Sequence, residues 1–460
     1  MKKLLFLLFI IHYSLFISSA QSWQVVGTSG FSLGAAAYVS IAIDRHGIPS
    51  VQYADSAIGT AFVMKFNGTS WQYVGTPDWY DVDGGPDEGL PIVIDSNGTP
   101  YVPYADINGN GGATVVKFNG TTWDSVGIHG FSAGHICYIS LALDRNGTPY
   151  VAYCDDTYPD GNMTVMKFNG TAWQNVGSSG FFDIGGIWGT CIAIDSNGTP
   201  YVLAVDRGYG LRLSVMKFNG TAWQYVGSPG LSAGLANYMS IAIDHSGTPY
   251  VAYCDYGTPN IGTTVKKFNG TAWQLVGNAS FSQGATFTNY IAIDSNGTPY
   301  VEYDDVANGH KATVMKFDGT TWQNVGNAGF TPGAVNYNSC FSLSPSGVPY
   351  VVFSDVTHSN KVTVMKFDTA TGIEEPSPKG GMNLYPNPAN GNIVIDYPPQ
   401  LSGATLVFYN TLGKEVKRIK VSAASTSLRL NTTDLEPGVY YYTLQSGGAV
   451  VEGKKMVVVR

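Results

Sequence analysis

Short runs of alternating apolar and polar residues, separated by turns rich in Gly and Asn, fill most of this 460-residue chain. One repeat shows the pattern in four segments, Ser140–Asp144, Tyr150–Asp155, Thr164–Gly170 and Trp173–Gly177, each of which has the length and the period of a strand. We name them strands A to D. The A–B and C–D turns contain Asn-Gly, which favours tight hairpins because both central residues of a type I′ turn need positive φ. The pattern therefore predicts a four-stranded antiparallel sheet in this repeat.

The strand A motif ends in Asp and returns at a nearly constant interval. Its seven copies, the last of them degenerate, end at Asp44, Asp95, Asp144, Asp195, Asp244, Asp294 and Ser344, with spacings of 49 to 51 residues. Four antiparallel strands in about 50 residues make one blade of a propeller. We therefore predict an all-β chain with a seven-bladed β-propeller over residues 21–367.

The strand D motif starts with Trp and is out of step with strand A. Trp23 stands before the first strand A, whereas the last repeat ends without a Trp. We expect Trp23 to Gly27 to pair beside Val362 to Phe367, so that the N-terminal strand completes the last blade. This closure would remove the two open sheet edges of the ring.

The N-terminus has the pattern of a signal peptide over residues 1–20. Met1-Lys2-Lys3 precedes an apolar run from Leu4 to Ile17, and small residues follow, so cleavage is expected between Ala20 and Gln21. No other apolar run is long enough to span a bilayer, and we expect no transmembrane anchor.

Composition and charge narrow the range of partners. The chain has 56 Gly and 29 Tyr but only 13% charged residues, which suits short strands and tight turns. Between Gln21 and Phe367, 14 Lys and Arg stand against 25 Asp and Glu. Nucleic acid is excluded as a partner, because binding to phosphates depends on basic side chains.

The last part of the chain has a different pattern. A linker rich in Pro, Gly and charge spans residues 368–382, and alternating strands with Gly turns predict a small β-sandwich over residues 383–460. Three motifs occur here in a fixed order, followed by a basic residue: Tyr385-Pro386-Asn387-Pro388 with Gly391, Tyr409-Asn410-x-x-Gly413, Leu435-x-Pro437-Gly438-Val439-Tyr440, and Lys455.

These motifs resemble the type A sorting domain of the type IX secretion system. The repeated sequence of the blades resembles repeat propellers of exported Bacteroidota proteins. The resemblance implies transport through the periplasm by the type IX machinery. It also implies removal of the domain at the outer membrane, leaving the cargo extracellular or on the cell surface. The alternative is an independent adhesive sandwich.

Strand B ends in Asp in every blade, and these residues are our candidate ligand-binding groups. They are Asp55, Asp106, Asp155, Asp206, Asp255, Asp305 and Asp355. A ring of carboxylates at the entrance to the longer B–C loops would accept hydrogen bonds from sugar hydroxyls or hold Ca²⁺. The alternative is that each Asp caps the amides of its own loop.

Blade 2 carries a candidate calcium site. Asp81 and Asp83 precede its strand A, and Asp106, Asn108 and Asn110 follow its strand B in the order of a calcium-binding loop. The twelfth position is Lys117 instead of Glu, and the alternative is a solvated acidic loop.

The D–A segments carry recurrent aromatic residues. Phe recurs in a Phe-Ser-x-Gly motif, as at Phe31 and Phe131, and tyrosines stand near strand A at Tyr38, Tyr138, Tyr238, Tyr290 and Tyr337. Aromatic rings beside carboxylates suit sugars, but packing between blades explains them equally.

The sequence does not support any catalytic residue. The propeller has two glutamates, its histidines are scattered, and no nucleophile elbow or P-loop is present. We expect an exported binding or adhesion protein for glycans or protein surfaces, with a divergent polysaccharide-active enzyme or an inert scaffold as alternatives. Of the five cysteines, Cys137 and Cys154 lie on neighbouring predicted strands, where a disulfide is possible.

Overall fold

The computed structural model describes residues 21–57, 59–76, 91–106, 111–158, 161–184, 189–368, 383–385, 389, 391–396, 404–411, 413–421, 427–446 and 449–459. The chain divides into a larger unit spanning Ser19–Thr371 and a smaller one that contains Gly372–Arg460. Both consist of strands, apart from short 3₁₀ turns at Arg207–Tyr209, Val306–Asn308 and Val356–His358 in the larger unit. Among these residues, no helix is both long and apolar enough to cross a membrane. The all-β prediction is confirmed.

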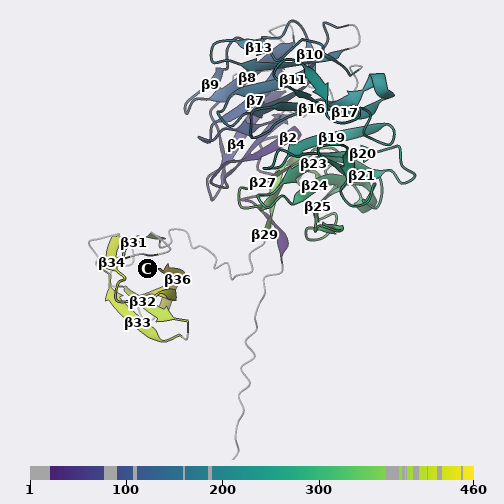
Figure 1. Cartoon of the computed structure of the whole chain (residues 1–460). Coiled ribbons are helices and arrows are strands. Elements are labelled where there is room, and N and C mark those ends of the chain that lie inside the picture. Colours follow the sequence, from purple (N-terminus) through teal and green to yellow (C-terminus); the bar gives the residue numbers. More distant parts are fainter. Residues whose placement is uncertain are drawn as a thin grey trace, which may run out of the picture. The chain divides into compact units, whose positions relative to one another are not determined.

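The larger unit is a β-propeller, and its described strands form seven antiparallel sheets in the predicted order A, B, C, D (Figure 1). The first three sheets contain β2 (Ala36–Ile43), β3 (Pro49–Asp55), β4 (Thr60–Phe66), β5 (Trp71–Tyr73); β6 (Val93–Ile94), β7 (Pro100–Asp106), β8 (Gly112–Phe118), β9 (Trp123–Ser125); and β10 (Ile136–Leu143), β11 (Pro149–Asp155), β12 (Asn162–Phe168), β13 (Trp173–Asn175), with β14 (Phe182–Asp183) beside β12.

The next three sheets contain β15 (Cys191–Ile194), β16 (Pro200–Asp206), β17 (Arg212–Phe218), β18 (Trp223–Tyr225); β19 (Ala236–Ile243), β20 (Pro249–Asp255), β21 (Gly262–Phe268), β22 (Trp273–Leu275); and β23 (Thr286–Ile293), β24 (Pro299–Asp305), β25 (Lys311–Phe317), β26 (Trp322–Asn324). The last sheet contains β27 (Ser339–Leu343), β28 (Pro349–Asp355), β29 (Lys361–Asp368) and β1 (Ser22–Val25).

The ring is closed by the N-terminal strand, as the sequence predicts. β1 pairs antiparallel with β29, so that Trp23 lies opposite Phe367 and Val25 opposite Met365. Figure 1 shows β1, in purple, beside β29. The strands A contact one another in chain order around the axis, and β27 contacts β2. The first and last blades are thus joined both at the axis and through a shared sheet.

The tight A–B turns have a local cause in the sequence. Oδ1 of Asp44 accepts hydrogen bonds from the backbone N–H groups of His46 and Ile48, both at 2.9 Å. The same turn recurs at Asp95, Asp144, Asp195, Asp244 and Asp294. The degenerate Ser344 uses its hydroxyl to accept from Val348 N–H at 3.0 Å. The repeated Asp therefore fixes a turn, which sets the register of the hairpin.

Neighbouring blades are joined by one repeated aromatic contact. The indole N–H of Trp173 donates to the carbonyl of Val126 in the preceding blade at 2.6 Å, and the indole stacks on Phe131 with ring centroids 4.1 Å apart. Trp23 makes the same contacts across the closure, to the Val325 carbonyl at 2.8 Å and to Phe330 at 3.8 Å. The recurrent Phe of the D–A segments is thus explained by packing between blades.

The smaller unit is a sandwich of two antiparallel sheets over one core. One sheet has the order β30 (Asn383–Tyr385), β31 (Asn392–Asp396), β34 (Ser427–Asn431). The other has the order β33 (Glu415–Lys420), β32 (Thr405–Asn410), β35 (Gly438–Ser446), β36 (Ala449–Val458). Ile393 and Ile395 of the first sheet share a buried cluster with Leu406 and Phe408 of the second. The small β-sandwich predicted for the C-terminal part is confirmed.

Candidate functional site

The strands A carry unusual backbone conformations near the propeller axis. Tyr38, Tyr138, Tyr238 and Thr288 have φ between +48° and +53°, a region that bulky residues rarely adopt. In each of these strands the pairing with strand B shifts register at the same place. Each shift is a β-bulge that re-aims a side chain. Such strain persists only where the surrounding structure fixes it, and it is often found at functional sites.

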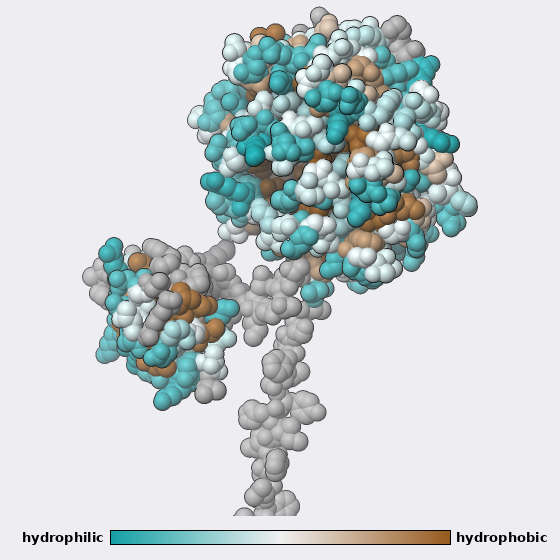
Figure 2. Space-filling model, in the orientation of Figure 1, coloured by the Kyte–Doolittle hydropathy of each residue, from teal (hydrophilic) through white to brown (hydrophobic). Residues whose placement is uncertain are grey.

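A cavity of about 510 Å³ lies where these bulges meet. Its wall is formed mainly by the strands A and the residues just before them, and it includes all four bulge residues together with Asn336 and Tyr337, which also have positive φ. Other lining residues are Val39, Ser40, Pro91, Ile139, Ser140, Gly189, Thr190, Cys191, Asn237, Met239, Asn289, Tyr290, Asn338, Ser339 and Cys340. Figure 2 shows apolar residues exposed among polar ones near the middle of the larger unit. This volume lies in the usual range of small-ligand sites.

The cavity wall combines apolar and polar groups, and it has no charged side chain among the described residues. Several of its polar groups are already used within the fold: the Asn338 side chain accepts from the Tyr38 N–H at 3.0 Å, and Thr288 and Ser339 share a hydrogen bond of 3.1 Å. The Asn289 side chain differs. Its Oδ1 accepts from Thr263 at 2.6 Å, but its buried Nδ2 has no hydrogen-bond partner. A donor in this state is available to a ligand and is otherwise costly to bury.

Blade 6 differs from other blades in the residues that strands A and B place near the axis. Tyr290 occupies the strand A position that Ser40, Ser140 and Ser240 hold in three other blades, and it lies opposite Glu302 of β24. Both carboxyl oxygens of Glu302 are buried without a hydrogen-bond partner. Burial raises the pKa of Glu302 well above the usual range of a glutamate, and the nearby Ser339 hydroxyl only partly opposes this rise. Burial thus favours the neutral carboxylic acid form of the Glu302 side chain over the carboxylate.

An aromatic cluster stands beside the cavity between blades 5, 6 and 7. Phe287 packs edge-on against Tyr238 and Tyr337, with ring centroids 4.9 Å and 4.5 Å apart. Tyr337 remains 50% exposed. The His310 ring stacks on Phe287 at 5.8 Å, and its Nδ1 lies 3.0 Å from Oδ1 of Asp304. The cluster presents an aromatic surface at the edge of the cavity.

The buried Asp304 organises this edge. Its Oδ2 accepts from the backbone N–H of Tyr337 at 3.0 Å, so one carboxylate holds both the tyrosine backbone and the imidazole. Burial raises the pKa of Asp304, although the hydrogen bonds from Tyr337 and His310 oppose the rise. Sequence reasoning missed Asp304, Asn289, His310 and Phe287, because each occurs in one blade only.

The seven strand B aspartates lie buried at the ends of their strands, outside the cavity wall, and their contacts are to the surrounding loops and strands. In Asp155, Oδ1 accepts from the Thr157 N–H at 3.1 Å and Oδ2 from the Thr164 hydroxyl at 3.0 Å. Thr164 in turn accepts from the Gly180 N–H at 2.9 Å. The buried set is Asp55, Asp106, Asp155, Asp206, Asp255, Asp305 and Asp355. These contacts fit the loop-capping alternative, and a role in ligand binding stays a prediction.

Most of the candidate calcium site lies outside the described residues. Asp81, Asp83, Asn108 and Asn110 belong to the segments that the structure does not describe. Asp106 is described, and its Oδ2 lies 3.1 Å from Nδ1 of His129 and 3.4 Å from the Thr114 hydroxyl. Calcium binding in blade 2 stays a prediction.

The motif residues of the smaller unit occupy turns and strands of the sandwich. The Gly391 carbonyl accepts from the N–H and the hydroxyl of Thr432, both at 2.7 Å, and Gly413 lies in the turn after β32 with φ +75°. Gly438 begins β35, and the buried Tyr440 donates from its hydroxyl to the Glu436 carbonyl at 2.9 Å. Tyr385 ends β30 and Lys455 lies in β36, whereas Pro386, Asn387 and Pro388 lie outside the described residues.

Fold and site together define an all-β propeller protein with a cavity where its strands A meet. Residues 383–459 match the family of secretion system C-terminal sorting domains, so this part of the chain is a type IX sorting domain. The chain is therefore a cargo of the type IX machinery, which takes it to the cell surface or the medium. The export route expected from the sequence motifs is confirmed at this level. No curated protein matches the chain.

Solved structures with a similar fold cover about two thirds to three quarters of the chain. The BP39L lectin from Burkholderia pseudomallei is 14% identical, with a TM-score of 0.52 over 73% of this chain and 97% of the lectin. A polysaccharide lyase described as an ulvan lyase is 14% identical, with a TM-score of 0.49 over 74% of this chain and 95% of the lyase. AofleA from Arthrobotrys oligospora is 12% identical, with a TM-score of 0.43 over 66% and 88%. At such identities the first likeness shows the propeller fold alone.

Proposed function

We propose that the larger unit is a carbohydrate-binding module that holds a neutral sugar in the central cavity. The observation that carries this proposal is the wall itself, where tyrosine rings, amides and hydroxyls surround a space of about 510 Å³. Sugars have apolar faces that pack on aromatic rings and hydroxyls that need several hydrogen-bond partners, and this wall offers both.

The charge of the wall narrows the ligand class. Sialic acid, uronic acid and phosphate are typically held by Arg or Lys through charge-assisted hydrogen bonds, and the described wall has neither residue. A neutral hexose or disaccharide needs only uncharged donors and acceptors. Asn289 Nδ2 supplies a buried donor that has no partner in the protein, and the half-exposed Tyr337 supplies a ring face.

A glycan array with the exported protein, with and without Ca²⁺, tests this function. We expect binding to neutral glycans that is lost in Tyr337→Ala and is unaffected in Tyr73→Ala, a control tyrosine of similar exposure on the outer strand β5. Loss of binding without Ca²⁺ would instead favour the predicted site around Asp106. Selective binding of anionic glycans, or no binding in either condition, would contradict the proposal.

For the mature form, we propose that the sorting domain is removed at the outer membrane and that the propeller is then displayed on the cell surface. A sorting domain serves transport, and the Pro-, Gly- and charge-rich residues 368–382 separate it from the propeller in the sequence. Fractionation of cells that express the full chain or a chain ending at Asp368 tests this. The full chain should yield a shortened product at the surface, and the truncated chain should stay in the periplasm. An uncleaved product, or one found only in the medium, would contradict display.

One observation supports a second candidate function, a polysaccharide-cleaving enzyme. Asp304 orients His310, because one of its carboxylate oxygens lies 3.0 Å from the imidazole Nδ1. The imidazole lies beside the exposed ring of Tyr337. An oriented imidazole next to a phenol can act as general base and acid. Release of reducing ends or unsaturated products from neutral and acidic polysaccharides measures this activity. Product formation that disappears in His310→Ala would favour the enzyme, and binding without product would favour the module.

A further inference from the structure

Blade 3 places four chemically distinctive side chains on one face of its sheet. Cys137 of β10 lies directly opposite Cys154 of β11. His135 precedes β10 and continues the same pairing, because its carbonyl accepts from the Asp156 N–H at 3.2 Å. Residues two apart in a strand point to the same side. The His135–Asp156 pair and the Cys137–Cys154 pair are therefore neighbours on one face.

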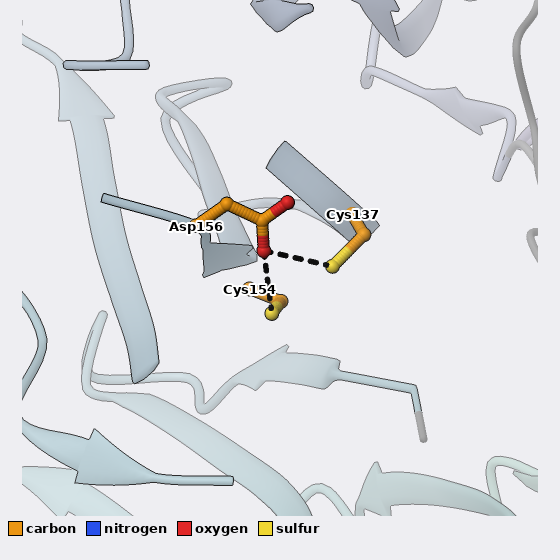
Figure 3. A group of neighbouring side chains, drawn as sticks. All are labelled: Cys137, Cys154 and Asp156. Atoms are coloured by element: carbon orange, nitrogen blue, oxygen red, sulfur yellow. Dashed lines mark hydrogen bonds between the residues drawn. The ribbon is translucent and has the colours of Figure 1, made fainter. Parts of the chain in front are cut away.

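Three of these side chains, those of Cys137, Cys154 and Asp156, meet at one carboxylate oxygen of Asp156 (Figure 3). Asp156 Oδ1 lies 3.6 Å from the sulfur of Cys137 and 3.7 Å from that of Cys154. One ligand atom from each of the three residues can be chosen so that all lie within 4.8 Å of one another. Ligand atoms that share a tetrahedral zinc ion at about 2.0–2.3 Å are about 3.5 Å apart. The cluster thus has nearly the spacing of a metal site before any metal binds.

We propose that Cys137, Cys154 and Asp156 bind a zinc ion. Two thiols and a carboxylate form a ligand set that favours zinc. Harder cations such as Ca²⁺ bind oxygen ligands alone. Binding replaces the two thiol protons, which pass to solvent, by bonds to the metal. Three protein ligands leave the fourth tetrahedral position to water, and the exposed side of Asp156 gives the ion a path in.

His135 is the positioning residue of this site. Its Nδ1 lies 2.8 Å from Asp156 Oδ2, which leaves Oδ1 directed at the two sulfurs. The imidazole lies over Gly111, where a Cβ atom would come within 2.2 Å of the ring. Carboxylate ligands are commonly held in this way by a second hydrogen bond.

The other blades provide a matched control within the same chain. In blade 5, Cys254 occupies the slot of Cys154, but it faces Asn237, and Tyr256 stands where blade 3 has Asp156. Cys254 is as buried as Cys154. Substitution of Cys254 therefore removes an equivalent thiol without touching the proposed ligands.

A disulfide is the competing fate of the same two sulfurs. Opposed cysteines on adjacent strands have a Cα separation compatible with a bridge. All five cysteines are thiols in the structure, and each sulfur of this pair lies against the same carboxylate oxygen. A disulfide would leave Asp156 without a role as ligand and His135 without a role in positioning it, whereas a bound zinc ion uses all four side chains.

Cobalt substitution tests the site in the full chain, because thiolate-bound Co²⁺ has near-ultraviolet charge-transfer and visible bands. The reduced, metal-free protein is titrated with Co²⁺ and then with Zn²⁺. We expect one equivalent of Co²⁺ with thiolate bands that Zn²⁺ abolishes. The bands should be lost in Cys137→Ser and Cys154→Ser and kept in Cys254→Ser. In His135→Ala the affinity should fall about 10- to 100-fold.

Two results would overturn the proposal. One is the absence of thiolate bands in wild-type protein whose five thiols are free by chemical titration. The other is a Cys137–Cys154 disulfide found by mass spectrometry in protein collected from the cell surface or medium. Circular dichroism of the metal-free variants shows whether a loss of the bands comes from unfolding, and Asp156→Asn tests the same site without changing a cysteine.

Discussion

At the residue scale, Glu302 is a costly group to bury in the described propeller core. It is fully buried, its carboxyl oxygens have no hydrogen-bond partner, and burial raises its pKa. The corresponding position of strand B in blade 1 is Gln52, which is also fully buried and lies opposite Ser40 as Glu302 lies opposite Tyr290. The same chain therefore shows that a neutral amide of the same length fits this position.

Glu302→Gln should stabilise the protein at neutral pH by roughly 1–3 kcal/mol, because the amide stays neutral where the buried carboxyl must keep a proton that the unfolded state releases. Between the unfolded pKa near 4.5 and the higher folded pKa, only the folded state holds the proton, so stability falls as pH rises through this window. The substitution removes this fall, and the difference from wild type should vanish below pH 4.5. Urea denaturation at acidic and slightly alkaline pH measures it.

Gln52→Glu is the reciprocal control. This variant should lose stability at neutral pH and acquire a further fall in stability with rising pH, because it buries a second carboxyl in a similar place. Identical pH profiles of wild type and Glu302→Gln would show that Glu302 is solvated in the folded protein.

At the element scale, the joint between blades depends on a glycine that follows each strand D. Gly177 has φ +77°, and a Cβ there would lie 3.0 Å from Phe218 and 3.1 Å from Trp223 of the next blade. Gly220, in the C–D turn, has φ +95°, but a Cβ would meet no atom within 4 Å. Gly177 is thus required both by its positive φ and by the lack of room for a Cβ atom, whereas Gly220 is required by its positive φ alone.

Gly220→Ala should cost about 1–2 kcal/mol of stability through backbone strain. Gly177→Ala should cost a further 1–3 kcal/mol or so, because the aromatic rings of the next blade must shift. Thermal denaturation of the two variants measures the difference. Equal losses would mean that the joint tolerates an added methyl group.

Ring closure is a second element-scale property, and Trp23 is its direct probe. Trp23 and Trp173 are equally buried, each donates to a valine carbonyl, and each stacks on a phenylalanine. Trp23→Ala and Trp173→Ala should therefore each lower the free energy of unfolding by about 3–5 kcal/mol. A loss confined to Trp173→Ala would show that the N-terminal strand is not docked in the last blade.

At the scale of the whole molecule, the architecture follows from repeated features and the candidate site from unrepeated ones. The Asp44 turn recurs in six blades, which made the period, the hairpins and the closing strand predictable. The sorting domain was predictable for a similar reason, because its three motifs occur in a fixed order. Repetition also drew attention to the strand B aspartates, whose contacts are to loops and strands.

The cavity could not be derived in this way, because it depends on where bulges turn side chains. Tyr38, Tyr138 and Tyr238 were visible as recurrent tyrosines, but the positive φ that aims them at the axis has no sequence signal outside glycine. Asn289 and Asp304 each occur in one blade, and their importance comes from neighbours distant in the sequence, such as Thr263 and Tyr337.

The proposed sugar site in the central cavity predicts one sugar bound per chain, whereas a ring of blade sites would bind several. The most direct measurement is a calorimetric titration of the exported protein with the neutral sugar that the array selects, repeated on Tyr337→Ala. We predict one equivalent bound per chain and no measurable binding by the variant. Several equivalents per chain, or unchanged binding by the variant, would contradict a central glycan site.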